Sequence, residues 1–268
     1  MIEKVKEAEL LQVAIDAALL GGEEIMKIYA EEFEVLTKQD NSPLTIADQN
    51  ANLIIEKVLQ KTGFPILSEE GKHEDYLIRK NWDKLWIVDP LDGTKEFVKR
   101  NGEFTVNIAL IHKGSPIMGV IYVPVKEDLY FALEGIGSYK KSSFVKTIEN
   151  IDALISKSIS LPIVTERDSY IVVGSRSHMS KETEEFFNQK RQQHGNVEVM
   201  AVGSSLKLCM VAEGKADAYP RYAPTMEWDT GAGDAICRMA GFKVLQYNSE
   251  NPLKYNKEDL LNPWFLVK

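Results

Sequence analysis

Asp89-Pro90-Leu91-Asp92-Gly93-Thr94 is the stretch of this sequence on which our expectation for the fold and the site rests. It directly follows the apolar run 85–88, which predicts a β-strand, so the aspartates lie where a strand ends. Pro90 fixes the backbone and Gly93 permits a tight turn, which lets the two carboxylates converge. Such a pair suits a hard cation like Mg²⁺, which binds carboxylate, carbonyl and water oxygens. An acidic surface turn with a helix cap is the structural alternative, and composition alone does not separate the two.

Two other acidic segments occupy comparable positions. Glu69 and Glu70 follow the apolar run 65–67, and Asp229 precedes the small residues 231–233 near the expected start of a helix. Each has an ordinary structural explanation, since acidic pairs at strand ends are usually solvated and an aspartate before a helix is usually its N-cap. Together the segments supply hard oxygen ligands for about two or three Mg²⁺ ions, which polarise a phosphoryl group and lower the pKa of bound water. The carboxylates in question are Glu69, Asp89, Asp92 and Asp229.

Composition and charge exclude several classes of protein. Of the 268 residues, 44% are hydrophobic and 27% are charged, as in an ordinary folded globular protein. The formal net charge of −8 opposes binding to a nucleic-acid polymer, whereas a small phosphate ester is compatible with it because a bound metal inverts the local charge. The N-terminus resembles neither a signal peptide nor a lipidation site, and no apolar run reaches the length of a membrane span. We therefore expect a cytoplasmic protein, with peripheral membrane contact left open and no oligomeric state specified.

No other catalytic motif competes with the acidic segments. The sequence contains no GxSxG nucleophile elbow, no HExxH zinc motif, no GxxxxGK[ST] phosphate loop and no cysteine–histidine pair. Cys209 and Cys237 lie in apolar surroundings, which favours buried, reduced thiols. Metal-assisted hydrolysis is therefore the chemistry that the sequence favours. The histidines, which lie in polar surroundings without metal-ligand spacing, are His73, His112, His178 and His194.

The order of the predicted elements divides the chain into two halves. In the first half, apolar residues at helical spacing predict two helices, with Gly21-Gly22 as a candidate bend, and short apolar runs predict an antiparallel meander. In the second half, strands alternate with helices, which indicates a layered α/β arrangement. The polar stretch 140–160 is the candidate boundary, giving parts 1–145 and 146–268 with the site between them. The expected helices cover 7–30, 45–61, 181–192, 205–213 and 230–239, and the expected strands cover 65–67, 85–88, 105–111, 117–123, 129–133, 170–173, 197–202 and 217–219.

Four of these segments resemble motifs of the inositol monophosphatase superfamily. Residues 89–94 resemble its first metal motif, and Trp228-Asp229-x-x-Ala-Gly resembles its second. Upstream, Leu67-Ser-Glu-Glu70 and Pro43-x-Thr-x-x-Asp48 follow in the expected order, although the spacing of Thr45 and Asp48 alone would also fit a helix-start cap. The run 86–111, with Lys95-Glu96-Phe97 after the motif, is most similar to bacterial bisphosphate nucleotidases. Later matches extend the resemblance from about residue 10 to the C-terminus, at 175–178, 203–207, 212–217, 219–221 and 261–263.

The resemblance implies a fold, an activity and a cofactor. The fold would be the layered αβαβα sandwich of sugar phosphatases, of the α+β class, with the site between the two halves. The activity would be Mg²⁺-dependent conversion of adenosine 3′,5′-bisphosphate to AMP and phosphate, with adenosine 3′-phosphate 5′-phosphosulfate as a second substrate and inhibition by Li⁺. The alternatives are an inositol or other sugar monophosphatase with the same metal core, and a non-catalytic nucleotide-binding protein. An intact set of metal ligands argues against the last of these.

The resemblance also implies roles for individual residues. Asp48 and Thr94 would orient and deprotonate the attacking water, with Glu70 beside the metal ligands. The sequence departs from the nucleotidase pattern at Gly231 and Asp234, which puts contacts to the base or ribose in doubt. Mg²⁺ would be bound by Glu69, Asp89, the Leu91 carbonyl, Asp92 and Asp229. Substrate contacts would come from Glu69, Leu91, Asp92, Gly93, Thr94, His178, Ser204, Lys207, Arg221 and Asp229.

Overall fold

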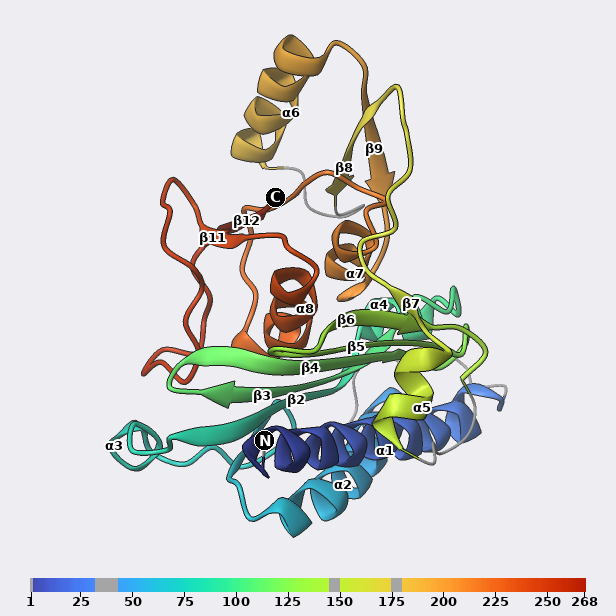
Figure 1. Cartoon of the computed structure of the whole chain (residues 1–268), viewed down its shortest axis with the longest axis vertical. Helices are drawn as coiled ribbons and strands as arrows, with labels where there is room; N and C mark the ends of the chain where they lie inside the picture. The colour runs from blue at the N-terminus through green and yellow to red at the C-terminus, as the bar shows by residue number, and fades with distance from the viewer. Residues whose placement is uncertain (1, 32–42, 145–149, 175–179) are drawn as a thin grey trace.

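A seven-stranded sheet with two long helices on one face forms the first two layers of the protein. Helices α1 (Ile2–Tyr29) and α2 (Pro43–Leu59) pack against each other and against this sheet (Figure 1). The short helix η1 (Gln60–Thr62) then leads into the first strand. The structure is a computed structural model, and it describes residues 2–31, 43–144, 150–174 and 180–268.

The strands of the central sheet follow one another in chain order. The first two strands are parallel and are joined through α3 (Tyr76–Arg79), and all later neighbours are antiparallel. The antiparallel meander expected from the sequence is therefore confirmed from β2 to β6, but it was wrong for the run 65–67, which pairs in parallel with β2. The strands are β1 (Ile66–Ser68), β2 (Lys84–Asp92), β3 (Thr105–His112), β4 (Ser115–Val123), β5 (Asp128–Leu133), β6 (Gly137–Lys141) and β7 (Ile159–Ser160).

Three further layers cover the other face of the central sheet. Helices α7 (Leu206–Ala212) and α8 (Glu227–Met239) lie on that face, two smaller sheets lie beyond them, and α6 (Lys181–His194) is outermost (Figure 1). The expected αβαβα sandwich is confirmed. Among the described residues, no helix combines the length and the apolar character that crossing a membrane requires. The smaller sheets pair β8 (Tyr170–Gly174) with β9 (Val197–Ala201) in parallel, and β10 (Tyr219–Arg221), β12 (Phe265–Val267) and β11 (Val244–Gln246) in antiparallel order.

Helices on both faces of the central sheet explain why its strands are apolar along their whole length. Successive side chains of a strand point to opposite faces, so a strand covered on both sides buries every residue. On β3, Ile108 and Leu110 enter the core beneath α1 and α2, whereas Ala109 and Ile111 enter the core beneath α7 and α8. The sheet is thus the common wall of two apolar cores.

A row of small residues lets α8 lie very close to the sheet. Ala109, Gly119 and Ala132 pair across β3, β4 and β5. A Cβ atom at Gly119 would lie 2.3 Å from the carbonyl oxygen of Ala232 on α8, and one at Gly231 would lie 3.2 Å from Cβ of Ala109. Gly119 and Gly231 are therefore needed for the short distance between α8 and the sheet. This distance also fixes the position of Asp229 in the first turn of α8.

The structure corrects one expectation for α1 and adds detail at the expected boundary. Gly21 and Gly22 do not interrupt α1; a Cβ atom at either position would contact Ile55 or Tyr122 closer than 3.0 Å, so these glycines allow close packing. Beyond the boundary at 145/146, α5 (Ile151–Ser156) still packs against α1, and β7 pairs with β6. The division into 1–145 and 146–268 stays a prediction.

Substituting Gly119 tests the importance of the close approach of α8. Gly119→Ala should lower the free energy of unfolding by about 1–3 kcal/mol or more, because the added methyl group overlaps the backbone of α8. Urea denaturation measures this change. Gly174→Ala is the matched control, since a Cβ atom there meets nothing closer than 3.5 Å. Equal stability of the two variants would show that α8 is not held against the sheet in this way.

Candidate active site

A bulge near the end of β2 brings Asp89 and Asp92 to the same face of the sheet. Residues three apart on a regular strand point to opposite faces. Here Asp89 pairs with Asn107 and Asp92 pairs with Thr105, so three steps on β2 match two steps on β3. The extra residue is a β-bulge, and it returns Asp92 to the face that Asp89 occupies. The Asp89 side chain also accepts a hydrogen bond from the backbone N–H of Leu91 (3.1 Å).

Parallel pairing of β1 and β2 places Glu69 next to this bulge. Ser68 pairs with Val88, and the backbone N–H of Glu69 donates to the carbonyl of Val88 (3.1 Å). Carboxyl ends of parallel strands lie at the same edge of a sheet, so Glu69 meets Asp89 there. Glu70 follows at an exposed position.

Asp229 reaches the same place from the first turn of α8. This helix begins at Glu227, three residues before the expected start at 230, so the interpretation of Asp229 as an N-cap is wrong. Its Oδ2 instead accepts a hydrogen bond from the backbone N–H of Met226 (2.9 Å). The carboxylate is held at the N-terminal end of the helix, where the helix dipole favours negative charge.

The carboxylates of Glu69, Asp89 and Asp229 form a cluster that could hold a metal ion. One oxygen from each lies within 4.8 Å of the others. Asp89 is almost completely buried, and burial together with neighbouring carboxylates, first that of Asp92, raises its pKa well above the ordinary value. All the donors are hard oxygens and their charges are mutually repulsive, so the residues present fit a divalent cation such as Mg²⁺.

The same electrostatic effect extends to the other acidic residues. Although part of Glu69 is exposed, desolvation and then the charge of Asp92 raise its pKa to about 7. Desolvation and the charge of Asp92 likewise raise the pKa of Asp229 to about 7. A cluster with such raised pKa values is partly protonated at neutral pH until a cation compensates its charge.

Asp48 lies inside α2, beside this cluster. Because α2 begins at Pro43, Asp48 is not at the start of the helix, and the capping interpretation of this residue is wrong. Its side chain is buried, and Oδ1 has no hydrogen-bond partner among the described residues. Desolvation, and then the charges of Glu70 and Glu69, raise its pKa to about 8. A buried carboxyl group with a free oxygen facing other carboxylates is a candidate for proton transfer at neutral pH.

Asp92 is held by residues on β3 and on the turn before α7. The Ser205 backbone N–H (2.6 Å), the Ser205 hydroxyl (2.5 Å) and the Asn107 amide (3.2 Å) all donate to its Oδ2. Gly93 follows with a left-handed φ of 95°, and α4 (Thr94–Val98) begins directly after it. The turn that the glycine was expected to permit is confirmed, and Thr94 is exposed at the first position of α4.

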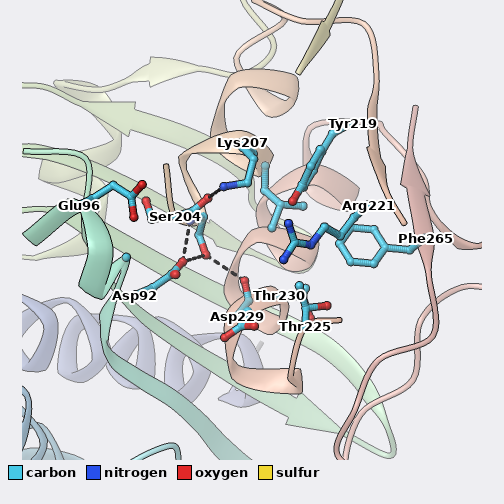
Figure 2. Close-up of a pocket in the computed structure, with 13 residues that line it drawn as sticks. Asp92, Glu96, Ser204, Lys207, Tyr219, Arg221, Thr225, Asp229, Thr230 and Phe265 are labelled. Carbon is cyan, nitrogen blue, oxygen red and sulfur yellow. Dashed lines mark hydrogen bonds between the residues drawn. The ribbon is translucent and has the colours of Figure 1, made fainter. Parts of the chain in front are cut away.

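A cavity of about 110 Å³ lies next to the acidic cluster and contains two cationic side chains. Figure 2 shows Asp92 and Asp229 on one side of it and Lys207 and Arg221 on the other. Lys207 is buried and donates to the carbonyl of Ser204 (2.7 Å); burial lowers its pKa to about 8. The guanidinium of Arg221 donates to the carbonyl of Pro224 (3.0 Å), while its buried Nε has no partner among the described residues. The interpretation of Lys207 as a solvated surface charge is wrong, whereas Arg221 is half-buried in the cavity wall.

Several residues around the cavity were not anticipated from the sequence. Ser205 and Asn107 donate hydrogen bonds to Asp92. The sequence did not indicate this role, because both residues are distant from Asp92 in the chain and were noted only within longer segments that resemble the family. His178 lies outside the described residues. Of the expected contacts, those in the cavity wall are Asp92, Gly93, Ser204, Lys207, Arg221 and Asp229, and Glu96, Tyr219, Thr225 and Phe265 join them.

The two departures from the nucleotidase pattern lie outside the cavity wall. Gly231 faces Ala109 and Tyr255, where it allows α8 to approach β3. Asp234 is fully buried, forms an ion pair with Arg238 (2.5 Å) and accepts a hydrogen bond from Tyr255 (2.7 Å). Both departures therefore serve the packing of α8.

Known proteins resemble this chain in sequence and in structure. A sequence profile of the inositol monophosphatase family matches residues 6–264. The chain belongs to the inositol monophosphatase family. The family is metal-dependent, generally on Mg²⁺. The resemblance of the sequence to this family is thereby confirmed.

Relatives in the family include proteins named 3′(2′),5′-bisphosphate nucleotidase CysQ. That of Escherichia coli O157:H7 is 42% identical over 263 residues, covering 96% of this chain and 99% of the relative. That of Haemophilus influenzae is 31% identical over 262 residues, covering 96% and 92%. The crystal structure of CysQ from Bacteroides thetaiotaomicron, a bacterial member of the family, has a TM-score of 0.93 and 57% identity, covering 97% of both chains.

The raised pKa values predict how pH changes the effect of Mg²⁺ on stability. In the metal-free protein, carboxyls with raised pKa bind protons more tightly when folded, so stability should fall as pH rises from their ordinary values, 3.8 to 4.5, to about 7 or 8. Mg²⁺ binds the deprotonated groups. The increase in melting temperature caused by Mg²⁺ should therefore be larger at about pH 8 than at about pH 5.5.

Thermal unfolding with EDTA or with Mg²⁺ at both pH values measures this difference. Glu69→Gln, which removes one ligand charge from the cluster, should reduce the Mg²⁺ effect at the higher pH. An increase in melting temperature that is the same at both pH values would contradict the assignment of the cluster as the metal site.

Proposed function

We propose that the protein is a Mg²⁺-dependent 3′(2′),5′-bisphosphate nucleotidase that converts adenosine 3′,5′-bisphosphate to AMP and phosphate. The observation that carries the proposal is the arrangement around one cavity, with a carboxylate cluster on one side and two cationic side chains on the other. The first side suits a phosphate bound through metal ions. The second suits another phosphate bound directly by protein cations. A substrate with two phosphates fits both.

The cationic side of the cavity supports recognition of a phosphate that is not cleaved. Burying a positive charge is costly unless an anion accompanies it, and within the described part of the chain the buried Lys207 ammonium donates to the carbonyl oxygens of Val202 and Ser204 alone. Arg221 keeps a buried Nε donor without a partner among the described residues. Phosphate oxygens would accept from both groups in charge-assisted hydrogen bonds. A substrate with a single phosphate on the metal side would leave these donors unused.

The metal side supports hydrolysis without a covalent intermediate. Glu69, Asp89, Asp92, Asp229 and the Leu91 carbonyl would hold about two or three Mg²⁺ ions. When bound, Mg²⁺ would neutralise phosphoryl oxygens and lower the pKa of a coordinated water. Phosphoryl transfer depends mainly on positioning and on charge compensation, so the chain needs no nucleophilic side chain of its own.

Residues next to the cluster would position the water and accept its proton. Asp48 has a buried carboxyl group whose Oδ1 has no partner among the described residues, and a bound cation would lower its pKa from about 8 so that it could accept a proton. Thr94 would donate or accept at the water from the start of α4, and Glu70 would lie beside the metal ligands. Gly93 leaves room where a Cβ atom would approach the Ser204 side chain to 3.1 Å, so the phosphate can contact the backbone there.

The proposal extends to a second substrate and to a location. Adenosine 3′-phosphate 5′-phosphosulfate carries the same 3′-phosphate and a similar anionic 5′-group, so it would bind in the same orientation. His178 would join Ser204, Lys207 and Arg221 around the nucleotide. A cytoplasmic location stays a prediction from the sequence.

Removing the guanidinium of Arg221 tests the substrate class. Arg221→Ala should lower kcat/KM for adenosine 3′,5′-bisphosphate by about 10- to 100-fold, because a charge-assisted contact to the second phosphate is lost. It should barely change kcat/KM for inositol 1-phosphate, which has one phosphate. Arg167→Ala is the control, since Arg167 pairs with Asp217 away from this cavity. Equal losses on both substrates, or a wild-type preference for inositol 1-phosphate, would move the assignment to an inositol or sugar monophosphatase.

Removing the hydroxyl of Thr94 tests the role proposed for this residue. Thr94→Ala should lower kcat by at least about 10-fold with a smaller change in KM, because the hydroxyl aligns the water and does not hold the nucleotide. Steady-state kinetics with adenosine 3′,5′-bisphosphate at saturating Mg²⁺ separate the two constants. Thr94→Ser keeps the hydroxyl and should recover most of kcat. An intact kcat with a raised KM would show that Thr94 binds substrate.

A further inference from the structure

Ser205 contacts both acidic segments that approach each other across the site. Its backbone N–H (2.6 Å) and its hydroxyl (2.5 Å) donate to Oδ2 of Asp92, and its hydroxyl oxygen also lies 2.8 Å from the carbonyl oxygen of Asp229. Asp92 belongs to β2 and Asp229 to α8, so one buried side chain connects an edge of the central sheet with the helix that covers it.

The hydrogen bonds to Asp92 leave one of its oxygens available. Among the described residues, the donors to this carboxylate all reach Oδ2, the third being the amide of Asn107 (3.2 Å). The Asn107 amide also donates to the Ser205 hydroxyl oxygen (2.9 Å), which leaves the hydroxyl proton to be given to Asp92 or to the Asp229 carbonyl. The carboxylate is thus fixed through Oδ2, and Oδ1 is left for a cation.

The turn that carries Ser205 is held in place by the first half of the chain. Ser204 adopts a left-handed φ of 46°, a conformation that a residue with a side chain keeps only when its surroundings enforce it. The backbone N–H of Gly203 donates to Glu103 (2.9 Å), and a Cβ atom at Gly203 would overlap the side chain of Glu96. Because this turn is fixed, both donors of Ser205 point at Asp92.

We propose that Ser205 is a positioning residue that sets the separation of Asp92 and Asp229 and thereby the affinity of the site for its divalent cation. The inference rests on the proposed function, and Ser205, which lies in the cavity wall, would act through Asp92 and the Asp229 segment, to which its hydrogen bonds go. Groups that orient metal ligands by hydrogen bonds typically contribute about 10- to 100-fold to metal affinity. Ser205→Ala keeps the backbone donor and removes only the hydroxyl, so the fold is retained while Asp92 and the Asp229 segment are no longer linked.

Calorimetric titration of the EDTA-treated protein with Mn²⁺ or Mg²⁺, without substrate, tests the proposal. Ser205→Ala should raise the Kd for the cation by about 10- to 100-fold, and the Mg²⁺ concentration for half-maximal hydrolysis should rise by a similar factor. At saturating Mg²⁺, KM for the nucleotide should stay unchanged. Ser205→Thr, which restores the hydroxyl, should recover most of the affinity. Ser138→Ala is the matched control, because the Ser138 hydroxyl is buried on β6 without a partner among the described residues.

The possible outcomes separate this inference from the proposed function. A wild-type protein that binds no divalent cation refutes the proposed function itself. A wild-type protein that binds the cation while Ser205→Ala binds it with the same Kd overturns the positioning role and leaves the function intact. Should circular dichroism show that Ser205→Ala is unfolded, Ser205→Gly, which also keeps the backbone donor, takes its place in the same titration, and an unchanged Kd for that variant is equally decisive.

Discussion

Bringing several carboxylates together in a partly buried place is the physical constraint on which the rest of this structure depends. Like charges repel each other and burial removes their solvation, so Glu69, Asp89 and Asp229 approach only because the backbone forces them together. A pair of parallel strands holds Glu69 next to Asp89, and a helix packed on small residues holds Asp229. A β-bulge turns Asp92 toward them. The apolar cores on the two faces of the sheet supply the stabilisation that offsets the repulsion. Binding of a divalent cation removes it.

The cavity beside the cluster follows from the same layered arrangement. Helix α8 lies on the central sheet and presents Asp229 at its first turn, while α7 and β10 carry Lys207 and Arg221 to the opposite wall (Figure 2). Negative and positive groups thus face each other across the cavity of about 110 Å³. Without a ligand, both sides hold buried charge that is incompletely compensated. A metal-bound phosphate on one side and a second phosphate on the other would satisfy both, which is why the arrangement favours a bisphosphate.

The sequence predicted the segments of the site better than their geometry. Acidic residues directly after apolar runs identified Glu69 and Asp89, because strand ends place side chains at the edge of a sheet. The bulge that turns Asp92 to the same face could not be predicted, since it depends on pairing with β3. The burial of Asp48 and Lys207 and the contacts of Ser205 depend likewise on segments distant in the chain. From the sequence, Gly231 was expected to change the contacts to the substrate. The structure shows instead that Gly231 allows α8 to pack closely against Ala109 of β3.

This charge cluster should act in hydrolysis only when a divalent cation compensates it. The most direct measurement is the release of phosphate from adenosine 3′,5′-bisphosphate by protein dialysed against EDTA, before and after addition of Mg²⁺. We expect no release above background in the metal-free state and full recovery with Mg²⁺, because the carboxylates alone repel the phosphoryl group. Undiminished hydrolysis by the metal-free protein would contradict it.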